Sequence, residues 1–287
     1  MARLAYVNGR YVQHSHAAVH IEDRGFQFAD GVYEVIPIVN KRMIDPQQHL
    51  DRLESSLLEM NITMPASRRV LELVVDELID CNGVFEGLVY MQVTRGVAPR
   101  DHKFPKGVQP SIVITTKRAR FLTQNNLRDG VKVITIPDIR WNRCDIKTVS
   151  LLPNCMGKTQ AAAAGAYEAW QVDRKGLVTE GTSSNAWIVT DDDKLLTRPV
   201  GHEILRGVTR QSLLRIADEE GLTIEEQAFS VEEAKAAREA FVSSATSFVT
   251  PVVSIDDTTI GDGTPGPLSR RLQGWYLDYC TGLKNLA

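Results

Sequence analysis

The chain has 287 residues, of which 43% are hydrophobic and 24% charged, and its formal net charge is −3. This is the composition of a folded globular protein, and the lack of a basic run with interleaved aromatic residues argues against nucleic-acid binding. No apolar run approaches the roughly 18 residues of a membrane span, no apolar leader follows Met1, and the four scattered cysteines favour free thiols in the cytoplasm, without a metal site.

The first part of the chain predicts a mixed α+β layer. Two β-prone runs flank Asn8-Gly9, and because both turn residues tolerate positive φ, they predict a hairpin. Apolar residues at helical or strand spacing then predict helices over residues 46–59 and 66–81 and strands over residues 87–94 and 111–116. The polar stretch that follows predicts an interdomain linker, with a small α+β domain over residues 1–118, the linker over 119–128 and a large domain over 129–287.

The large domain is expected to hold both strands and helices. The strands are predicted over residues 131–136, 166–172, 186–189, 194–197 and 240–243, and the helices over 154–165, 209–220 and 267–282. They do not alternate regularly, and no glycine-rich phosphate fingerprint follows a strand. The fold class is therefore α/β with α+β layers in two domains, and a dinucleotide-dependent dehydrogenase is disfavoured.

Two lysines stand out as candidates for amine chemistry, which needs a lysine that forms a Schiff base with a cofactor aldehyde. Lys147 lies among apolar and small residues in a strand-like segment, whereas Lys158 lies in the alanine-rich helix and equally fits an exposed helix charge. Most lysines are solvated surface charges, so the pattern leans to Lys147 without excluding Lys158.

Three polar segments of the large domain are candidates for binding a cofactor. Glu180 precedes small hydroxyl residues in a tight turn, although a plain polar hairpin loop has the same pattern. Gly207 and Thr209 stand where a helix begins, with Thr209 as the expected N-cap; such a helix start binds anions, or is simply capped. The hydroxyl-rich segment 243–247 follows a strand and fits either a phosphate or nothing.

A carboxylate-binding pair is predicted in the small domain. Arg100 and His102 are two residues apart in a loop anchored by Pro99, so both side chains point the same way in an extended chain. A solvated charged loop is the alternative. His14-x-His16 lacks further ligands, so a metal site is not expected there.

Taken in order, these segments resemble the fold-type IV family of pyridoxal-phosphate enzymes. The resemblance runs from the Asn8-Gly9 hairpin to the C-terminal helix. In the family the cofactor-bearing lysine precedes the glutamate loop by just over thirty residues, and Lys147 lies 33 positions (180 minus 147) before Glu180. The resemblance therefore implies Lys147 as the catalytic and cofactor-bearing residue, and Glu180 as the partner of the pyridine nitrogen.

The resemblance also implies the other site residues. Besides those two residues, the resemblance implies a phosphate-binding arginine, Arg52, and a leucine behind the cofactor ring, Leu205. Further backbone or hydroxyl donors to the cofactor are expected from Val208, Thr209, Ser244, Ala245 and Thr246. Ala245 departs from relatives that have a threonine there. The substrate α-carboxylate is expected to be held by Tyr33, Arg100 and His102, with His49 and Arg140 supporting the tyrosine and the glutamate.

The Arg-x-His pair points to the D-amino-acid aminotransferases of the family, in which it comes from the neighbouring subunit. The resemblance thus implies a homodimer that exchanges amino groups between D-amino acids, such as D-alanine, D-glutamate or D-aspartate, and 2-keto acids such as 2-oxoglutarate or pyruvate. The alternatives on the same fold are a branched-chain L-amino-acid or (R)-amine transaminase and an aminodeoxychorismate lyase. A catalytically dead cofactor-binding module is the alternative from another class.

Overall fold

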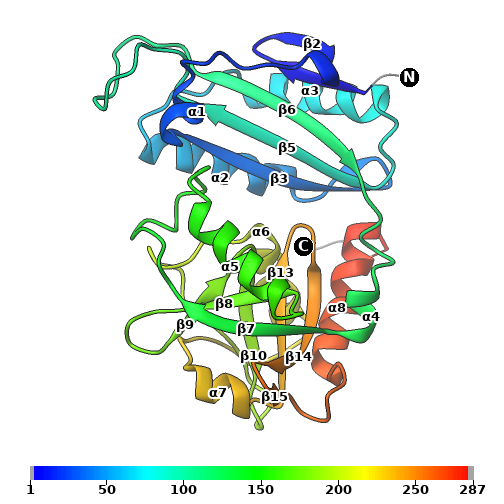
Figure 1. The fold of residues 1–287 in the computed structure, drawn as a ribbon. Helices are drawn as coiled ribbons and strands as arrows, with labels where there is room; N and C mark the ends of the chain where they lie inside the picture. The colour runs from blue at the N-terminus through cyan, green and yellow to red at the C-terminus, as the bar shows by residue number, and fades with distance from the viewer. Residues whose placement is uncertain (1–2, 284–287) are drawn as a thin grey trace. The chain divides into compact units, whose positions relative to one another are not determined.

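The computed structural model describes residues 3–283. Its contacts divide the chain into two compact units, drawn in Figure 1. The N-terminal unit comprises Met1–Arg120 and Ile146–Ser150, and the C-terminal unit comprises Phe121–Asp145 and Leu151–Ala287. Each unit has its own sheet, and the two are described in turn.

The N-terminal unit is built on a six-stranded antiparallel sheet in the order β2-β1-β6-β5-β3-β4. Its strands are β1 (Leu4–Val7), β2 (Arg10–Gln13), β3 (Gly31–Val39), β4 (Arg42–Met43), β5 (Gly87–Thr94) and β6 (Ser111–Arg118). The predicted hairpin is confirmed, because Asn8 and Gly9 turn with φ of 46° and 88° between β1 and β2. The predicted strands β5 and β6 are confirmed, with β6 two residues longer.

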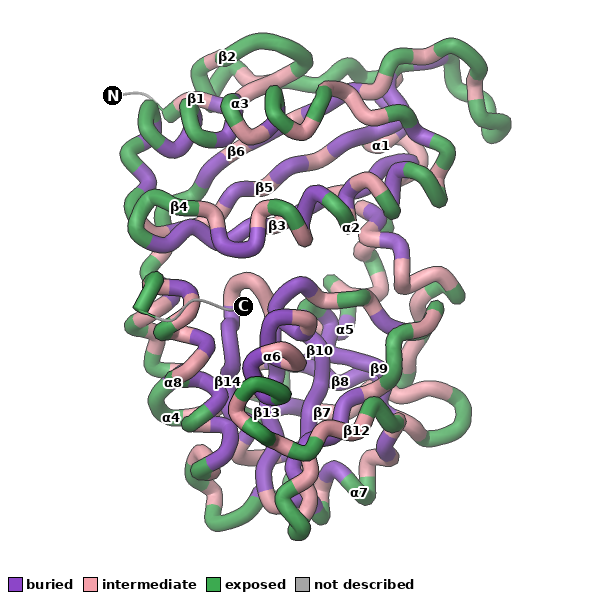
Figure 2. Tube along the Cα trace, turned by 180° about the vertical axis from the view of Figure 1, so that it is seen from behind, coloured by how far each residue is buried: buried purple, intermediate pink, exposed green. Residues whose placement is uncertain are grey.

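Two long helices cover one face of this sheet, as Figures 1 and 2 show from opposite sides. They are α2 (Pro46–Glu59), which has the predicted bounds, and α3 (Arg68–Cys81), which begins two residues later than predicted because the Ser67 side chain caps it. Short helices are η1 (His14–His16) and α1 (Arg24–Phe28). Leucines and valines of α2 and α3 bury against β3, β5 and β6 in one apolar core.

Strand β3 was not predicted, although it carries Tyr33 and Glu34 and holds the segment of Lys147. Its second half is an almost uninterrupted apolar run containing Pro37, which lacks the alternation that identifies a strand. In its first half, Glu34 is buried on the helix-covered side, while Tyr33 and Val35 are half-buried. Alternation along a strand puts Tyr33 and Glu34 on opposite faces of the sheet.

The C-terminal unit has a mixed sheet in the order β12-β11-β10-β13-β14-β7-β8-β9, with β15 paired to β14. Strands β7, β8 and β14 run parallel as neighbours, whereas β10, β13 and β14 pair antiparallel. The strands are β7 (Val131–Pro137), β8 (Glu168–Val172), β9 (Val178–Gly181), β10 (Asn185–Val189), β11 (Leu195–Thr197), β12 (Ile224–Glu226), β13 (Glu239–Ser244), β14 (Phe248–Ile255) and β15 (Thr258–Thr259).

Helices pack around this sheet, whose strands are largely buried in Figure 2. They are α4 (Asn125–Asp129), α5 (Leu152–Ala163), α6 (Val208–Glu219), α7 (Val231–Ala236) and α8 (Pro267–Thr281). Helices α5, α6 and α8 lie within two residues of their predicted bounds, and β9, β12, α7, β14 and β15 were not predicted. Among the described residues, 3–283, no helix is both long and apolar enough to cross a membrane.

Three local expectations are corrected. Residues 119–128 are not wholly irregular, because α4 begins at Asn125 and buries Leu127. Thr209 does not cap α6; Gly207 is the N-cap, without a side-chain hydrogen bond. The segment around Lys147 is not a strand, and it groups with the N-terminal unit. The division of the chain into domains at residues 119–128 stays a prediction.

Candidate active site

Lys147 is held against the start of β3 by backbone hydrogen bonds. The carbonyl of Lys147 accepts from the amide of Tyr33 at 3.0 Å, and the amide of Val149 donates to the carbonyl of Gly31 at 3.0 Å. The amide of Lys147 itself donates to the Ser56 hydroxyl of α2 at 3.3 Å. This extended segment is thus fixed at two points on β3 and at one point on α2, which orders the lysine backbone without a regular strand.

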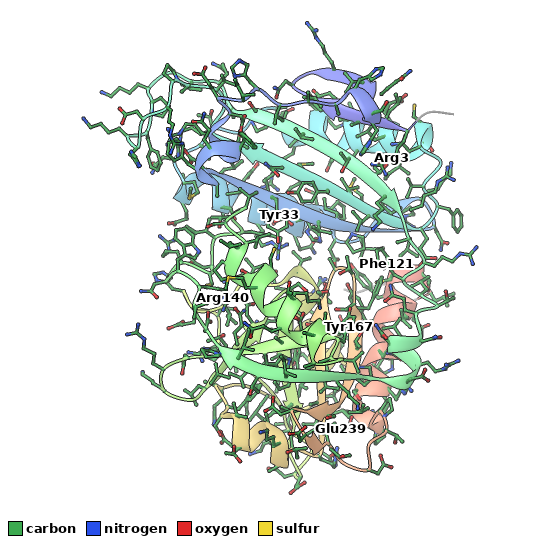
Figure 3. All side chains as sticks on the ribbon, in the orientation of Figure 1. Arg3, Tyr33, Phe121, Arg140, Tyr167 and Glu239 are labelled. Carbon is green, nitrogen blue, oxygen red and sulfur yellow. The ribbon has the colours of Figure 1, made fainter. Side chains whose placement is uncertain are left out.

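The Lys147 side chain lies over the Tyr33 ring, with Nζ 4.3 Å from the ring centroid. Tyr33, labelled in Figure 3, in turn contacts the ring of Tyr90 at a centroid distance of 5.6 Å. Burial raises the pKa of Tyr90 to about 12, so its hydroxyl stays protonated and donates to Gln92. The structure therefore brings together two of the predicted residues, Lys147 and Tyr33, on the face of β3 opposite Glu34.

On the helix-covered face, Glu34 is the centre of a buried cluster with His49 and Arg52, which we call the Glu34 cluster. Arg52 donates from Nε and Nη2 to the two carboxylate oxygens at 2.8 and 2.7 Å, and His49 Nδ1 lies 2.7 Å from Oε2. Burial by itself raises the pKa of Glu34, but the Arg52 guanidinium and His49 together lower it to about 2. The predicted phosphate-binding arginine is thus held in place by a carboxylate that sequence analysis did not single out.

The imidazole of His49 is neutral in this cluster. Burial lowers its pKa, and the neighbouring Arg52 charge adds to that effect, while the Glu34 carboxylate opposes it. A neutral ring next to a carboxylate oxygen donates its Nδ1–H. His49 therefore donates to Glu34, the residue after Tyr33, and not to Tyr33 itself. If His49 orients Tyr33, as predicted, it does so by fixing the neighbouring residue of β3.

Arg100 and His102 meet at Phe28, the last residue of α1. The Arg100 guanidinium lies 4.4 Å from the Phe28 ring centroid, and the His102 ring meets Phe28 edge-on at 5.6 Å. Both side chains are exposed, as expected of a binding loop. Within residues 3–283 of one chain, no hydrogen bond or ring contact joins this pair to Tyr33.

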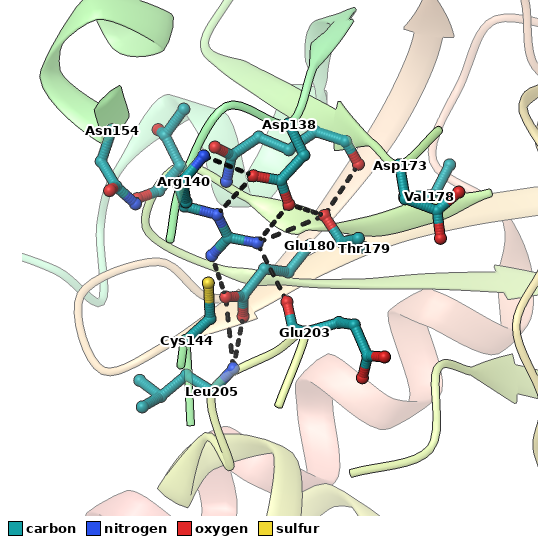
Figure 4. A network of polar contacts seen from close by, with 12 residues as sticks. Asp138, Arg140, Cys144, Asn154, Asp173, Val178, Thr179, Glu180, Glu203 and Leu205 are labelled. Atoms are coloured by element: carbon teal, nitrogen blue, oxygen red, sulfur yellow. Dashed lines mark hydrogen bonds and ion pairs between the residues drawn. The ribbon is translucent and has the colours of Figure 1, made fainter. Parts of the chain in front are cut away.

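In the C-terminal unit, Glu180 of β9 is a buried carboxylate surrounded by donors (Figure 4). Arg140 donates from Nη1 to its Oε1, and Asn185 donates from Nδ2 to its Oε2 at 3.1 Å. The backbone amide of Leu205 lies 3.1–3.2 Å from both oxygens. These donors stabilise the ionised carboxylate. Arg140, the predicted support of Glu180, does contact it, and Leu205, which was predicted to lie behind the cofactor ring, contacts it through its backbone amide.

Arg140 is shared with a second carboxylate, Asp138, that sequence analysis overlooked. Asp138 accepts from Nε at 3.0 Å and from Nη2 at 2.7 Å, and also from the Thr179 hydroxyl at 2.8 Å. Although burial opposes it, these contacts lower the pKa of Asp138, so the carboxylate is ionised. The Asp138-x-Arg140 spacing was visible in the sequence, but only the pairing with β9 shows that Arg140 bridges two carboxylates.

The first turn of α6 presents backbone amides that have no acceptor within the helix. The amides of Val208 and Thr209 belong to this turn, and both residues are buried. Gly207 has no room for a side chain, because a Cβ there would lie 2.1 Å from Oδ1 of Asn185, the residue that donates to Glu180. The glycine thus lets the helix start close to the Glu180 donors, an arrangement suited to an anion.

The hydroxyl-rich segment forms a tight turn between β13 and β14. The Ser244 hydroxyl accepts from the amides of Thr246 and Ser247 at 3.4 and 3.1 Å and lies 2.7 Å from the Ser247 hydroxyl. Ala245 lies half-buried at the tip. The turn is preorganised by its own hydrogen bonds, and Ser247, the last residue of the predicted segment, takes part in them.

Lys158, the alternative lysine, has a structural role. Its Nζ donates to the Tyr167 carbonyl at 2.5 Å and lies 3.5 Å from the buried Glu168 carboxylate. Glu168 also accepts from the hydroxyls of Ser183 and Ser184 at 3.0 and 3.1 Å and thereby fixes the loop between β9 and β10. Lys158 therefore supports the loop next to Glu180 and is not a competing candidate for covalent chemistry.

Comparisons with known proteins show the family and the fold of the chain. The family model of class IV amino-transferases matches residues 31–255. The chain belongs to this family. A curated D-alanine aminotransferase from Bacillus licheniformis is 44% identical over 266 residues, 93% of each chain. Among solved structures, the branched-chain amino acid aminotransferase of Escherichia coli superposes with a TM-score of 0.91 at 23% identity, covering 99% of this chain and 97% of the other.

The predicted fold-type IV architecture, aminotransferase family and pyridoxal-phosphate cofactor are thereby confirmed. A pyridoxal-phosphate-bound hypothetical aminotransferase from Mycobacterium tuberculosis shares the fold, with a TM-score of 0.85 at 23% identity, covering 98% of this chain and all of the other. The D-alanine aminotransferase relative bears out the expected D-amino-acid chemistry. The branched-chain enzymes resemble the chain in fold alone.

Proposed function

We propose that this class IV aminotransferase transfers amino groups between small D-amino acids, of the D-alanine, D-glutamate and D-aspartate type, and 2-keto acids such as pyruvate or 2-oxoglutarate. The observation that carries the proposal is the buried carboxylate of Glu180, which accepts hydrogen bonds from Arg140, Asn185 and the Leu205 amide. Such a carboxylate can hold a protonated pyridine nitrogen, which the bound cofactor needs to accept electrons from the substrate. The D-alanine aminotransferase relative supports the choice of substrate.

The residues of the chain fit pyridoxal phosphate by their chemistry. Glu180 supplies the carboxylate for the ring nitrogen, and Leu205 lies beside it. The α6 amides of Val208 and Thr209 and the guanidinium of Arg52 supply donors for the phosphate. The preorganised turn at Ser244, Ala245 and Thr246 adds hydroxyl and amide donors of the same kind.

Lys147 is the proposed covalent attachment point and the group that moves the substrate α-proton. Its backbone is fixed at three points on β3 and α2, which keeps Nζ in a defined position, and the Tyr33 ring lies directly beneath it. A fixed amine is what general acid–base catalysis requires, because proton transfer depends on hydrogen-bond reach. Tyr33 is then in a position to contact both the lysine and the substrate carboxylate.

Arg100 and His102 are the proposed carboxylate trap, acting across a homodimer. Both are exposed, and they meet on Phe28 without contacting Tyr33 of the same chain within residues 3–283. The N-terminal unit also exposes large apolar side chains, with Phe26 of α1 73% and Phe104 of the same loop 57% exposed. A second copy of the chain would cover such residues and bring its trap to this subunit's Tyr33. We place the enzyme in the cytoplasm, since its four cysteines are scattered along the sequence, a spacing that favours reduced thiols.

Visible absorbance of the protein with pyridoxal phosphate tests this function. The proposal expects a band at about 410–420 nm that D-alanine bleaches and L-alanine does not. Lys147→Ala should abolish the band, whereas Lys158→Ala is the matched control and should keep it. Bleaching by branched-chain L-amino acids alone would assign the enzyme to the alternative substrate class. A band that survives in Lys147→Ala but not in Lys158→Ala would overturn the lysine assignment.

A further inference from the structure

Arg24, the first residue of α1 (Figure 1), is a buried arginine that bonds to two separate segments of the N-terminal unit. Only 3% of its side chain is exposed, and Nε donates to Oδ2 of Asp30 at 2.7 Å. Its Nη1 donates to the backbone carbonyl of Asp101 at 2.6 Å. Asp30 directly precedes β3, whereas Asp101 lies in the exposed residues 99–104, called the trap loop below, between the two residues of the proposed carboxylate trap. Arg24 therefore joins the trap loop to the start of β3.

Arg24 also lies against the aromatic ring that both trap residues contact. Its guanidinium carbon is 4.6 Å from the centroid of the Phe28 ring, and Arg100 and His102 contact the same ring at 4.4 and 5.6 Å. Phe28 ends the helix that Arg24 begins, so one short helix supports the whole pair. Arg24 thus meets the trap twice, through the Asp101 carbonyl between its two residues and through the ring that they share.

The fold fixes Arg24 before the trap loop is considered. The carboxylate of Asp23 caps α1, and the amide of Arg24 donates to the Gly96 carbonyl at 2.9 Å. Asp30 is held from a second direction, because Arg95 donates to its two oxygens at 2.8 and 3.0 Å. Since the guanidinium is a rigid fork, fixing its Nε also fixes the direction of Nη1. Arg24 therefore presents a charged donor to the trap loop in a defined place, and hydrogen bonds from charged donors are the strong ones.

We propose that Arg24 is a positioning residue for the substrate carboxylate: it holds the trap loop so that Arg100 and His102 are ordered before a substrate binds. This rests on the proposed function, in which the pair binds the α-carboxylate across the homodimer. Exposed arginine side chains have many rotamers, and ordering them on binding lowers affinity. A loop that is already fixed between the two residues needs less of this ordering. Loss of Arg24 should therefore weaken substrate binding and leave the rate of proton transfer nearly unchanged, because the pair contacts the carboxylate and not the reacting atoms.

The test follows the bleaching of the holoenzyme's cofactor band by D-alanine in single turnovers, which gives the dissociation constant and the limiting rate separately. Arg24→Lys keeps a charge beside Asp30 but replaces the fork of donors with one ammonium, and Arg24→Met leaves Asp30 paired with Arg95. Each variant should raise the dissociation constant about tenfold and keep the limiting rate within about threefold of the wild type. Thermal unfolding identifies the variants that are folded.

Thr94→Val is the matched control. It removes the hydroxyl that donates to Asp23 at 2.9 Å, so it disturbs the cap of α1 but leaves the bond from Arg24 to the trap loop in place. Its dissociation constant for D-alanine should stay within about twofold of the wild type. An equal loss of affinity in Thr94→Val and Arg24→Lys would overturn the proposal, because any disturbance of α1 would then have the same effect.

A double-mutant cycle separates positioning from a general loss of structure. In the protein that carries both Arg100→Ala and His102→Ala, no trap remains for Arg24 to position. Adding Arg24→Lys to that protein should change the dissociation constant by less than about twofold, since residues that act through one another are not additive. A full tenfold effect there would overturn the proposal.

The His102 ring gives a readout that needs neither cofactor nor turnover. In the wild type it meets the Phe28 ring edge-on, so the ring current of Phe28 displaces its NMR resonances, which His102→Gln assigns. Arg24→Lys and Arg24→Met should move these resonances toward those of a free histidine, whereas Thr94→Val should not.

The outcomes distinguish this inference from the function on which it rests. Unchanged D-alanine binding in the folded Arg24 variants, or unchanged His102 resonances, would overturn the inference while the trap itself stands. If D-alanine does not bleach the wild type, or if it binds the protein with Arg100→Ala and His102→Ala as tightly as the wild type, the proposed function fails as well.

Discussion

The Glu34 cluster and the group of Asp138, Arg140 and Glu180, called the Arg140 cluster below, use the same chemical groups in different proportions. In the first, the Glu34 carboxylate faces the Arg52 guanidinium and the neutral imidazole of His49. In the second, the Arg140 guanidinium faces two carboxylates, those of Asp138 and Glu180. The comparison teaches that a buried guanidinium can be held by one carboxylate together with an imidazole, or can bridge two carboxylates that belong to different segments.

The clusters also differ in what titrates beside the arginine. The Glu34 cluster contains His49, which can take up a proton if its surroundings change, since its ordinary pKa is close to neutrality. Beside the Arg140 cluster lies Cys144, whose thiol has a pKa of about 12 and therefore stays protonated and neutral. Loss of the arginine should therefore be compensated in the first cluster and uncompensated in the second.

The largest effect is expected from Arg140→Met. It leaves Asp138 and Glu180 as two facing, largely buried carboxylates, and breaking a buried ion pair in this way costs about 3–5 kcal/mol of folding free energy. One carboxyl will then have a raised pKa, so the lost stability should return as the pH falls toward the ordinary carboxyl range. Urea unfolding followed by tryptophan fluorescence measures it, because all four tryptophans, Trp141, Trp170, Trp187 and Trp275, lie in the C-terminal unit.

The control for this variant is Arg143→Met, which removes a more exposed arginine that pairs with Asp145. Exposed pairs contribute at most about 1 kcal/mol. If Arg140→Met costs no more than this control at neutral pH, the two carboxylates do not depend on Arg140 and the described bridge between them is wrong.

Glu34→Gln should have the next largest effect, about 3 kcal/mol. The pKa of Glu34 in the folded protein is about 2, against an ordinary value of 4.5, and each unit corresponds to about 1.4 kcal/mol. Because the folded pKa is depressed, this stability is present above pH 4.5 and is lost as the pH falls toward 2. Hydrogen exchange of peptides from β3 and α2 reports it, and in the variant their protection should no longer decline across that interval.

Arg52→Met should cost less, about 2 kcal/mol at slightly alkaline pH, the range for a buried group that loses one partner. Without Arg52, His49 is expected to become protonated beside Glu34, which raises its pKa above 6.5. Its contribution is then present below pH 6.5 and is lost as the pH rises through the new value, the opposite of the wild type, where burial depresses the pKa of His49.

An NMR titration of the histidine rings checks this, with His49→Gln assigning the resonance among the six histidines. The cofactor-free protein is used so that phosphate binding does not enter. If the pKa of His49 stays below 6.5 in Arg52→Met, the imidazole does not replace the lost positive charge of the guanidinium.

Much of the fold was predicted from the sequence, because in helices such as α2 and strands such as β5 the apolar residues recur at helical or strand spacing. The elements that were not predicted have no such regular spacing of apolar residues. Strand β3 reads as a plain apolar run with Pro37, and β14 begins at Phe248, whose φ of 51° and place after a hydroxyl-rich turn hide the strand. Both are specified by their neighbours in the sheet, and pairing between distant segments is not written in either segment alone.

The candidate site shows the same limit. Family resemblance located Lys147, Glu180 and Arg140, since each lies in a recognisable motif. It did not reveal Asp138 or Glu34, because an acidic residue near an arginine is common on any surface and its meaning depends on burial. Only the register of β3 beside α2, and the approach of β9 to the segment after β7, show which carboxylates share a guanidinium.

The smallest effect, about 1 kcal/mol, is expected from Thr179→Val. The substitution is close to isosteric and removes a hydroxyl that donates to Asp138 and lies within reach of the Gln171 carbonyl at 3.0 Å. It alters no charge, so the affinity for pyridoxal phosphate, measured by fluorescence quenching, should stay within about twofold of the wild type. A larger loss of affinity would show that the Thr179 hydroxyl contributes more to the cofactor site than its hydrogen bond to Asp138.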